Sequence, residues 1–204
     1  MILANPPYDN EPGTTIAFLE RILDILKAGG RCAALVPEGF LTNTAKNRVI
    51  SMRRTLLYAC SVEAVISLPR EIYRPYTNSK SSLILFKKEP ASSGHLTFFG
   101  SVPEYDGPEN EFSNEAYRKD MEKIAQAWKL WRRGEHPAGE NDLFWTAASE
   151  ELQKLPFILD ADCHRGSGRT YVSQKKNEVW DSIFAGQKNL ERFVRNYFGE
   201  DAVL

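Results

Sequence analysis

A short loop near the start of the chain has residue types that suit the binding of an amino group on a flat ring. Asn5, Pro6, Pro7 and Tyr8 follow the apolar run Met-Ile-Leu-Ala. The amide oxygen of Asn5 and the backbone carbonyl of Pro6 are both acceptors, so together they can hold the two hydrogens of an exocyclic NH2. The two prolines restrict the backbone, which would pre-organise the loop and let Tyr8 stack on a ring. We therefore expect Asn5, Pro6, Pro7 and Tyr8 to form a catalytic loop.

The residues behind this loop predict alternating strands and helices. Apolar runs indicate strands at 1–4, 31–36, 62–68 and 81–86, and helical spacing indicates helices at 14–27 and 44–58. The first strand is expected to be buried, Thr14 or Thr15 to cap the first helix, and Arg53 to lie on the polar side of the second. Such alternation predicts an α/β fold, with a parallel-rich sheet and helices on both faces. Ligands should then bind beyond the carboxyl ends of the strands, where Tyr8, Pro37 and Leu68 are expected.

The order of these segments resembles a known family. The Asn-Pro-Pro-Tyr strand end is followed by Lys-Ala-Gly-Gly-Arg (27–31), Val-Pro-Glu-Gly-Phe-Leu (36–41), Leu68-Pro69 and Leu-Ile-Leu-Phe-Lys-Lys (83–88). The tetrapeptide resembles the catalytic motif of S-adenosylmethionine-dependent amino methyltransferases. The whole series is similar to the second half of the modification subunit of type I restriction systems. The resemblance implies that residues 1–90 are the C-terminal half of a Rossmann-like methyltransferase domain.

That resemblance also implies a reaction, a cofactor and partners. The expected reaction is site-specific methylation of adenine N6 in DNA, with S-adenosylmethionine as cofactor and the adenine flipped out of the duplex. Phe40 is expected to add a second wall to the base pocket beside Tyr8. Arg74, Tyr76, Asn78 and Lys80 are expected to border the DNA, on their position in the chain alone. The expected partners are DNA and the specificity and restriction subunits, or a fused recognition domain in their place.

The glycine-rich turn and the ribose-binding acid of a complete methyltransferase would precede the catalytic loop in the family order. Neither is found there, so the chain is expected to be a fragment that is inactive by itself. One alternative is a permuted, complete enzyme, in which Leu159–Asp162 and Gly166–Gly168 would form the cofactor loop. A second is an assembly or DNA-contact module without activity. A third is a protein-glutamine or RNA methyltransferase that shares the tetrapeptide.

The residues after 90 are expected to form an extension of the catalytic part, from 91 to 204. It would contain a strand at 96–102, a long helix at 114–133 capped by Ser113, and a helical tail at 173–198. The tail would pack on its own domain or on a partner helix, and both alternatives stay open. Trp128 and Trp131 share one helix face and are expected to pack in the core rather than against bases.

Composition narrows the class of protein. The 204 residues carry a net charge of −1, so any contact with a polyanion must come from a local patch or a partner. Cys32, Cys60 and Cys163 are scattered, which favours free thiols over disulfides or zinc. No stretch has the pattern of a membrane span or a signal peptide, so the cytoplasm is the expected location.

Overall fold

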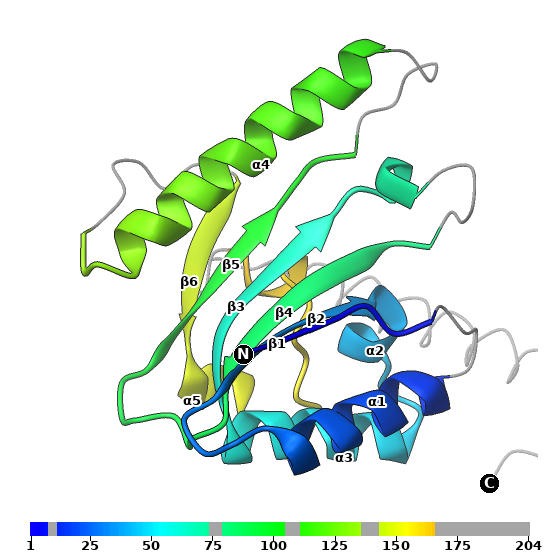
Figure 1. The fold of residues 1–204 in the computed structure, drawn as a ribbon, viewed down its shortest axis with the longest axis vertical. Coiled ribbons are helices and arrows are strands. Elements are labelled where there is room, and N and C mark those ends of the chain that lie inside the picture. Colours follow the sequence, from blue (N-terminus) through cyan, green and yellow to red (C-terminus); the bar gives the residue numbers. More distant parts are fainter. Residues whose placement is uncertain (8–11, 74–78, 105–110, 136–142, 166–204) are drawn as a thin grey trace, which may run out of the picture. The chain divides into compact units, whose positions relative to one another are not determined.

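The computed structural model describes residues 1–7, 12–73, 79–104, 111–135 and 143–165. The described residues build a six-stranded sheet with the strand order β1-β2-β4-β3-β5-β6 (Figure 1). The strands are β1 (Ile2–Ala4), β2 (Arg31–Pro37), β3 (Ser61–Leu68), β4 (Ser81–Lys87), β5 (Leu96–Ser101) and β6 (Phe144–Ala148).

Most strands of the sheet run in one direction. β1 is parallel to β2 and β3 is parallel to β5, whereas β4 lies antiparallel between β2 and β3. β6 is antiparallel to β5. β4 follows β3 in the chain after residues 69–80 and lies antiparallel to it. The predicted α/β fold is therefore confirmed. The sheet is mixed rather than parallel-rich, because β4 and β6 make three of its five strand pairings antiparallel.

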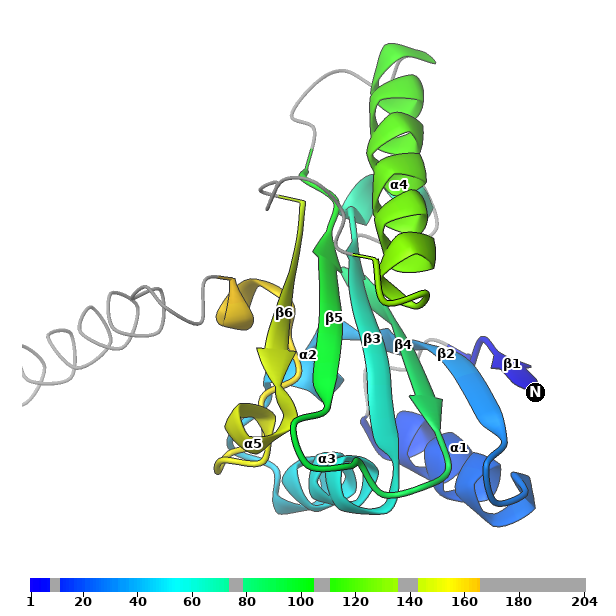
Figure 2. The same ribbon diagram turned by 90° about the vertical axis from the view of Figure 1, so that its left-hand side faces the viewer.

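Helices cover both faces of the sheet, as predicted. α1 (Pro12–Ile25), α2 (Glu38–Thr42), α3 (Asn47–Ala59) and α5 (Ser149–Leu152) share one core with Val65 and Phe99. α4 (Glu111–Trp131) lies on the opposite face, over a second core that contains Ile66 and Phe98 (Figure 2). Because neighbouring residues of a strand point to opposite faces, the two cores lie on either side of the sheet.

The helix boundaries differ from the expected ones at their amino ends. α1 begins at Pro12, so Thr14 and Thr15 lie inside the helix rather than at its cap. Proline is favoured in the first helical turn, because its missing N–H has no helical acceptor there anyway. α4 begins at Glu111, which places Ser113 inside it as well. The short elements α2, α5, β6 and the 3-10 turns η1 (Arg70–Tyr73) and η2 (Asp162–His164) were not expected from the sequence.

The long helix α4 packs closely on β5. A Cβ atom added to Gly100 would lie 2.8 Å from Cγ2 of Ile124, so the glycine is what allows this approach. The ring centroids of Trp128 and Trp131 lie 5.5 Å and 5.9 Å from that of Phe98. Both tryptophans therefore pack in the second core, as predicted.

The first strand lies at the edge of the sheet and is not buried. β1 pairs with β2, and no other described strand lies beside it. Leu3 is 73% exposed, which contradicts the expectation of a buried strand. An apolar run indicates burial only if a neighbour covers it, and none of the described elements does so here.

Cys32, Cys60 and Cys163 all lie in the described part of the chain, and none of them forms a disulfide. Burial raises the pKa of the Cys32 and Cys60 thiols to about 11, which keeps both protonated. Cys163 is only partly buried. Among the helices described, none is both long and apolar enough to cross a membrane.

Candidate active site

The loop that is expected to be catalytic begins where β1 ends. Ala4 is paired with Ala34 in the parallel register of β1 and β2, so Asn5 and Pro6 lie beside the carboxyl end of β2. The carboxyl ends of β3 and β5 lie at the same edge, because both run parallel to β2. Pro37 and Leu68 are the last residues of β2 and β3, as predicted. The candidate site therefore lies at the edge where α/β sheets bind ligands.

Asn5 presents its side chain to the solvent, whereas the neighbouring Pro6 is buried. Pro7 is exposed again, so Pro6 is the one buried residue among the described positions 5–7 of the loop. Within the part of the chain that the structure describes, no hydrogen bond engages the Asn5 amide. Its oxygen is therefore available to accept a hydrogen bond from a ligand.

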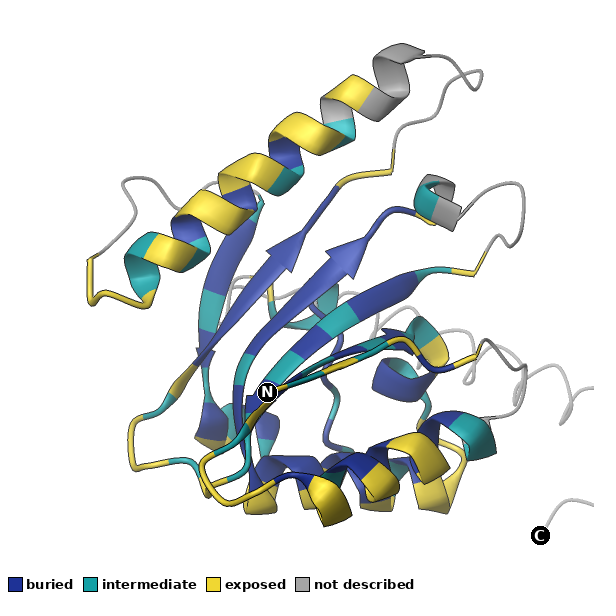
Figure 3. Cartoon of the chain, viewed as in Figure 1, coloured by how far each residue is buried: buried dark blue, intermediate teal, exposed yellow. Residues whose placement is uncertain are grey.

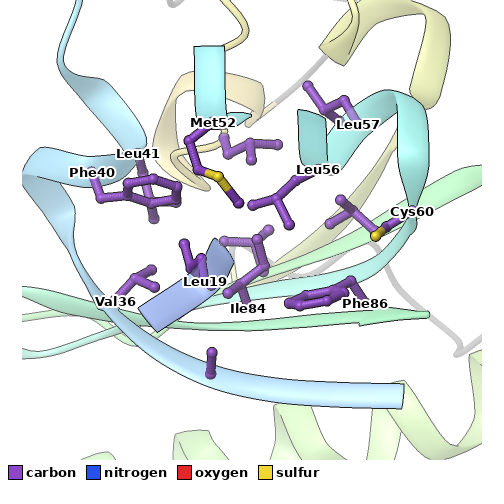
Figure 4. Packing of buried hydrophobic residues seen from close by; sticks show 14 of the residues in the cluster. Leu19, Val36, Phe40, Leu41, Met52, Leu56, Leu57, Cys60, Ile84 and Phe86 are labelled. Atoms are coloured by element: carbon purple, nitrogen blue, oxygen red, sulfur yellow. The ribbon is translucent and has the colours of Figure 1, made fainter. Parts of the chain in front are cut away.

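Phe40 lies in the core that α1, α2, α3 and α5 share. It follows β2 in the short helix α2 and has no exposed surface. Figure 4 shows its ring in the apolar cluster with Leu41 and Met52. In this conformation the ring is enclosed by the core and has no exposed surface for a base to stack on. Its contact with a base stays a prediction.

Lys80 is held by a carboxylate at the start of β4. Its Nζ lies 3.1 Å from Oδ2 of Asp162, and its side chain is 11% exposed. Burial by itself would lower the pKa of Lys80, but Asp162, Glu38 and Asp160 outweigh burial, so the pKa is raised. Lys80 is thus a charged, paired cation in this conformation, and its contact with DNA stays a prediction.

A second group of charges joins the segments that follow β2, β3 and β5. Arg70 follows β3 and lies 3.7 Å from the carboxylate of Glu38 and 3.6 Å from that of Glu104. The backbone N–H of Arg70 also donates to Oε2 of Glu104 at 2.9 Å. These contacts hold the rim of the site together through side chains that are part-exposed, so each contributes little free energy by itself.

Sequence reasoning missed the role of Arg53, which joins α2 and α3 to the segment before η2. The Arg53 side chain is fully buried, although its type suggested the polar side of α3. It donates to the backbone carbonyls of Phe40 and Asn43, each at 2.7 Å, and of Pro156 at 2.9 Å. Burial lowers its pKa to about 10, so it stays charged at neutral pH.

A signal for the burial of Arg53 was present in the sequence. Residues four apart on a helix share a face, and Arg53 lies four after Val49 and four before Leu57, which are both buried. The position is therefore part of the apolar stripe of α3. The expectation that Arg53 would be exposed came only from its charge.

Four expected site residues cannot be placed. Tyr8, Arg74, Tyr76 and Asn78 lie outside the described residues. The same is true of the glycine segment 166–168 and of the expected helical tail at 173–198. Their assigned roles stay predictions.

Comparison with known proteins decides the family. The model of the N-6 DNA methylase family matches residues 1–171. The chain belongs to this family. Its Asn-Pro-Pro-Tyr loop and the ordered strand ends lie inside the matched range.

Among curated members of the methylase family, the methylase subunit of the type I restriction enzyme EcoEI from Escherichia coli is 27% identical over 177 residues. The match covers 78% of this chain and 35% of that subunit. The methylase subunit of EcoKI from Escherichia coli K12 is 28% identical, over 42% of this chain and 18% of that subunit. The chain thus matches about a third or less of the length of these two relatives.

Solved structures support the same fold. A structure from work on the assembly of a type I restriction-modification system has a TM-score of 0.64 at 22% identity. The match covers 97% of this chain and 46% of the chain in that structure. The type I methyltransferase subunit from Streptococcus thermophilus has a TM-score of 0.55 at 21% identity, over 78% of this chain and 36% of its own. The methyltransferase α/β fold of the described residues is therefore confirmed.

The permuted alternative receives no support from the described part of its cofactor loop. It needs a strand that ends near Asp162, but residues 158–161 form no strand, and η2 follows them directly. Leu159 instead donates its backbone N–H to the carbonyl of Leu41, which ties this segment to α2. The segment thus packs as support for α2.

Proposed function

We propose that the chain forms the substrate side of an adenine-N6 DNA methyltransferase of a type I restriction-modification system. The observation that carries this proposal is the exposed, unengaged amide of Asn5 beside the buried Pro6, at the carboxyl edge of the sheet. Membership of the N-6 DNA methylase family supports the substrate class.

The proposed role of Asn5 and Pro6 is to hold and activate the amino group. The Asn5 amide oxygen and the Pro6 carbonyl would accept the two hydrogens of adenine N6, which directs the nitrogen lone pair away from the ring plane. As N6 bonds to the methyl carbon and the carbon–sulfur bond of the sulfonium breaks, positive charge would develop on N6 and both oxygens would stabilise it. Release of one N6 proton to solvent would then restore a neutral amine. The adenine must leave the base stack first, and stacking on Tyr8 would offset part of that cost.

S-adenosylmethionine is the proposed cofactor and would supply an electrophilic methyl group on its sulfonium. Residues 1–7, 12–73, 79–104, 111–135 and 143–165 show no glycine-rich turn after a strand that would fit its methionine part. The residues that bind the cofactor are therefore left unassigned. The uncovered edge of β1, with Leu3 73% exposed, is where a further strand of the methylase would pair.

The proposed partners follow from the curated relatives. Both are called methylase subunits of type I restriction enzymes. We propose that this chain likewise acts with a specificity subunit, which would select the DNA sequence, and with a restriction subunit.

The decisive experiment uses a full-length methylase that carries this segment, assembled with its specificity subunit. Asn5→Ala should lower kcat for methyl transfer by at least about a hundred-fold, because one stabilising contact to the developing charge is lost. Affinity for S-adenosylmethionine should stay within about two-fold, since the contact is made only with the base. Asn47→Ala, at an exposed asparagine of α3, is the matched control and should leave kcat unchanged. Turnover that survives Asn5→Ala would refute the assigned role.

A second measurement tests the division of labour on the 204-residue chain itself. Calorimetric titration with S-adenosylmethionine should show no binding at micromolar concentrations. Micromolar affinity would favour the permuted, complete enzyme instead.

A further inference from the structure

The helix α4 turns a strongly charged side away from the sheet. Its opposite side packs in the second core through Ile124, Ala127, Trp128 and Trp131. Figure 3 shows the exposed residues along the outer side of the helix. The exposed cations there and in the turn that follows are Arg118, Lys119, Lys123, Lys129, Arg132 and Arg133, and the exposed acids are Glu115, Glu122 and Glu135.

Some of these cations are already engaged by acids of the same helix. Lys119 pairs with Glu115 at 2.9 Å, and Lys123 pairs with Asp120 at 2.8 Å. Arg132 lies over the Trp128 ring, with its guanidinium carbon 5.7 Å from the ring centre. These three side chains are therefore committed to the helix and its core.

The remaining cations are Arg118, Lys129 and Arg133, and none of them has a salt bridge within the described ranges. Arg118 and Lys129 are about 16 Å apart along the axis and about 20° apart around it, so they lie on one line. Arg133 follows in the turn after the helix, where its backbone N–H donates to the carbonyl of Leu130. Glu122 is the one acid on the line between Arg118 and Lys129.

We propose that Arg118, Lys129 and Arg133 form a contact surface for the phosphate backbone of nucleic acid. Two exposed cations on one line of α4 and a third in the turn after it can each contact a phosphate, and the affinity of such contacts comes from the release of counterions. The whole chain has a net charge of −1, so only such a local excess can attract a polyanion.

This inference rests on the proposed function, which makes DNA the substrate, and adds a second contact to it. The active-site loop would grip one base at the carboxyl edge of the sheet. The α4 surface would hold the backbone without reading its sequence, since phosphate contacts carry no sequence information directly.

The test measures binding of DNA by the 204-residue chain. Fluorescence anisotropy of a labelled duplex gives the affinity at several salt concentrations. The variant is Arg118→Gln/Lys129→Gln/Arg133→Gln, whose side chains are exposed and have no salt bridges, so the fold should be unaffected. The matched control is Arg48→Gln/Arg54→Gln/Lys154→Gln, which removes the same charge from exposed positions on or beside the helices of the opposite face. Circular dichroism confirms that both variants stay folded.

The α4 variant should bind at least about five-fold more weakly at low salt, and the slope of log K against log salt should fall by about two to three. The control should change affinity by less than about two-fold. If both variants lost affinity equally, the net charge of the chain would explain the effect, and the proposal would be overturned. An α4 variant that binds the duplex like the wild type would overturn it as well. A wild-type chain that does not bind the duplex at low salt overturns it too.

Competition with polyglutamate tests whether the α4 surface binds nucleic acid or any acidic polymer, such as an acidic protein segment. Displacement of the duplex by polyglutamate at equal charge concentration would show that any acidic chain fits and would overturn the proposal. The outcome is independent of Asn5. Loss of the α4 effect leaves the Asn5 test intact, and a failed Asn5 test leaves the α4 contact intact.

Discussion

Arg53 donates from Nη1 to the backbone carbonyl of Phe40 at 2.7 Å, although the two residues belong to different helices. The same guanidinium binds the carbonyls of Asn43 and Pro156, so α2, α3 and the segment before η2 meet at one buried charge. No carboxylate pairs with it among the residues described. Among the described residues, the groups that stabilise the buried charge of Arg53 are therefore backbone carbonyls.

Replacement of this arginine should be costly. Arg53→Met removes all three hydrogen bonds and leaves one buried and two part-buried carbonyls without this donor, so we expect the free energy of unfolding to fall by about 3 kcal/mol. Arg53→Lys should recover part of the loss, because an ammonium can reach fewer of the carbonyls. Urea unfolding measures both. Arg54→Met, at the exposed neighbouring arginine, is the control and should stay within about 0.5 kcal/mol. A similar loss for Arg53→Met and Arg54→Met would contradict a special role for the buried group.

Gly100 should be intolerant of a side chain. Gly100→Ala would place a Cβ atom 2.8 Å from Cγ2 of Ile124, so we expect a loss of about 1–3 kcal/mol from forced movement of α4. In a double-mutant cycle, Ile124→Ala should reduce this cost, because it removes the atom that clashes. Gly39→Ala is the control, since a Cβ there would meet no atom within 4 Å. Equal effects at Gly100 and Gly39 would disprove the close approach of α4 to β5.

The stability of the fold should depend on pH through His164. Burial lowers the pKa of His164, although the Ile158 carbonyl, Asp160 and Glu151 act against it. The unfolded chain then binds the proton more readily than the folded one, so stability falls as the pH drops through about 6.5 and levels off below the folded-state pKa. His164→Gln should flatten this dependence. Urea midpoints between about pH 5 and pH 8 provide the measurement. A wild type and variant with parallel pH profiles would rule the histidine out.

Lys80 and Asp162 should be energetically coupled. The side chain of Asp162 is 36% exposed, so solvent weakens the pair, and we expect a coupling of about 0.5–1 kcal/mol. The cycle compares Lys80→Gln, Asp162→Asn and the double variant by urea unfolding. Lys87 and Glu89 form the reference pair, because their 2.6 Å contact is more exposed and should couple less. Coupling near zero between Lys80 and Asp162 would instead leave Lys80 free to contact DNA.

The sequence alone predicted the longer strands and helices in their order and the family of the chain, but not the short elements α2, α5 and β6. The catalytic role of the Asn-Pro-Pro-Tyr loop stays a prediction. Strand and helix positions follow from the period of apolar residues, which is a local property of the chain. The Asn-Pro-Pro-Tyr loop and the strand ends behind it are local as well, and the family match covers all of them. The core position of Trp128 and Trp131 also followed from helical spacing.

Only the tertiary structure decided which groups meet across the chain. The burial of Arg53 depends on carbonyls of Phe40 and Pro156, which no local pattern connects to it. The pairing of Lys80 with Asp162 joins residues 82 positions apart, and the exposure of Leu3 depends on which strands flank β1. Such contacts arise from the packing of distant segments, so their energies depend on neighbours that residue type and spacing do not specify.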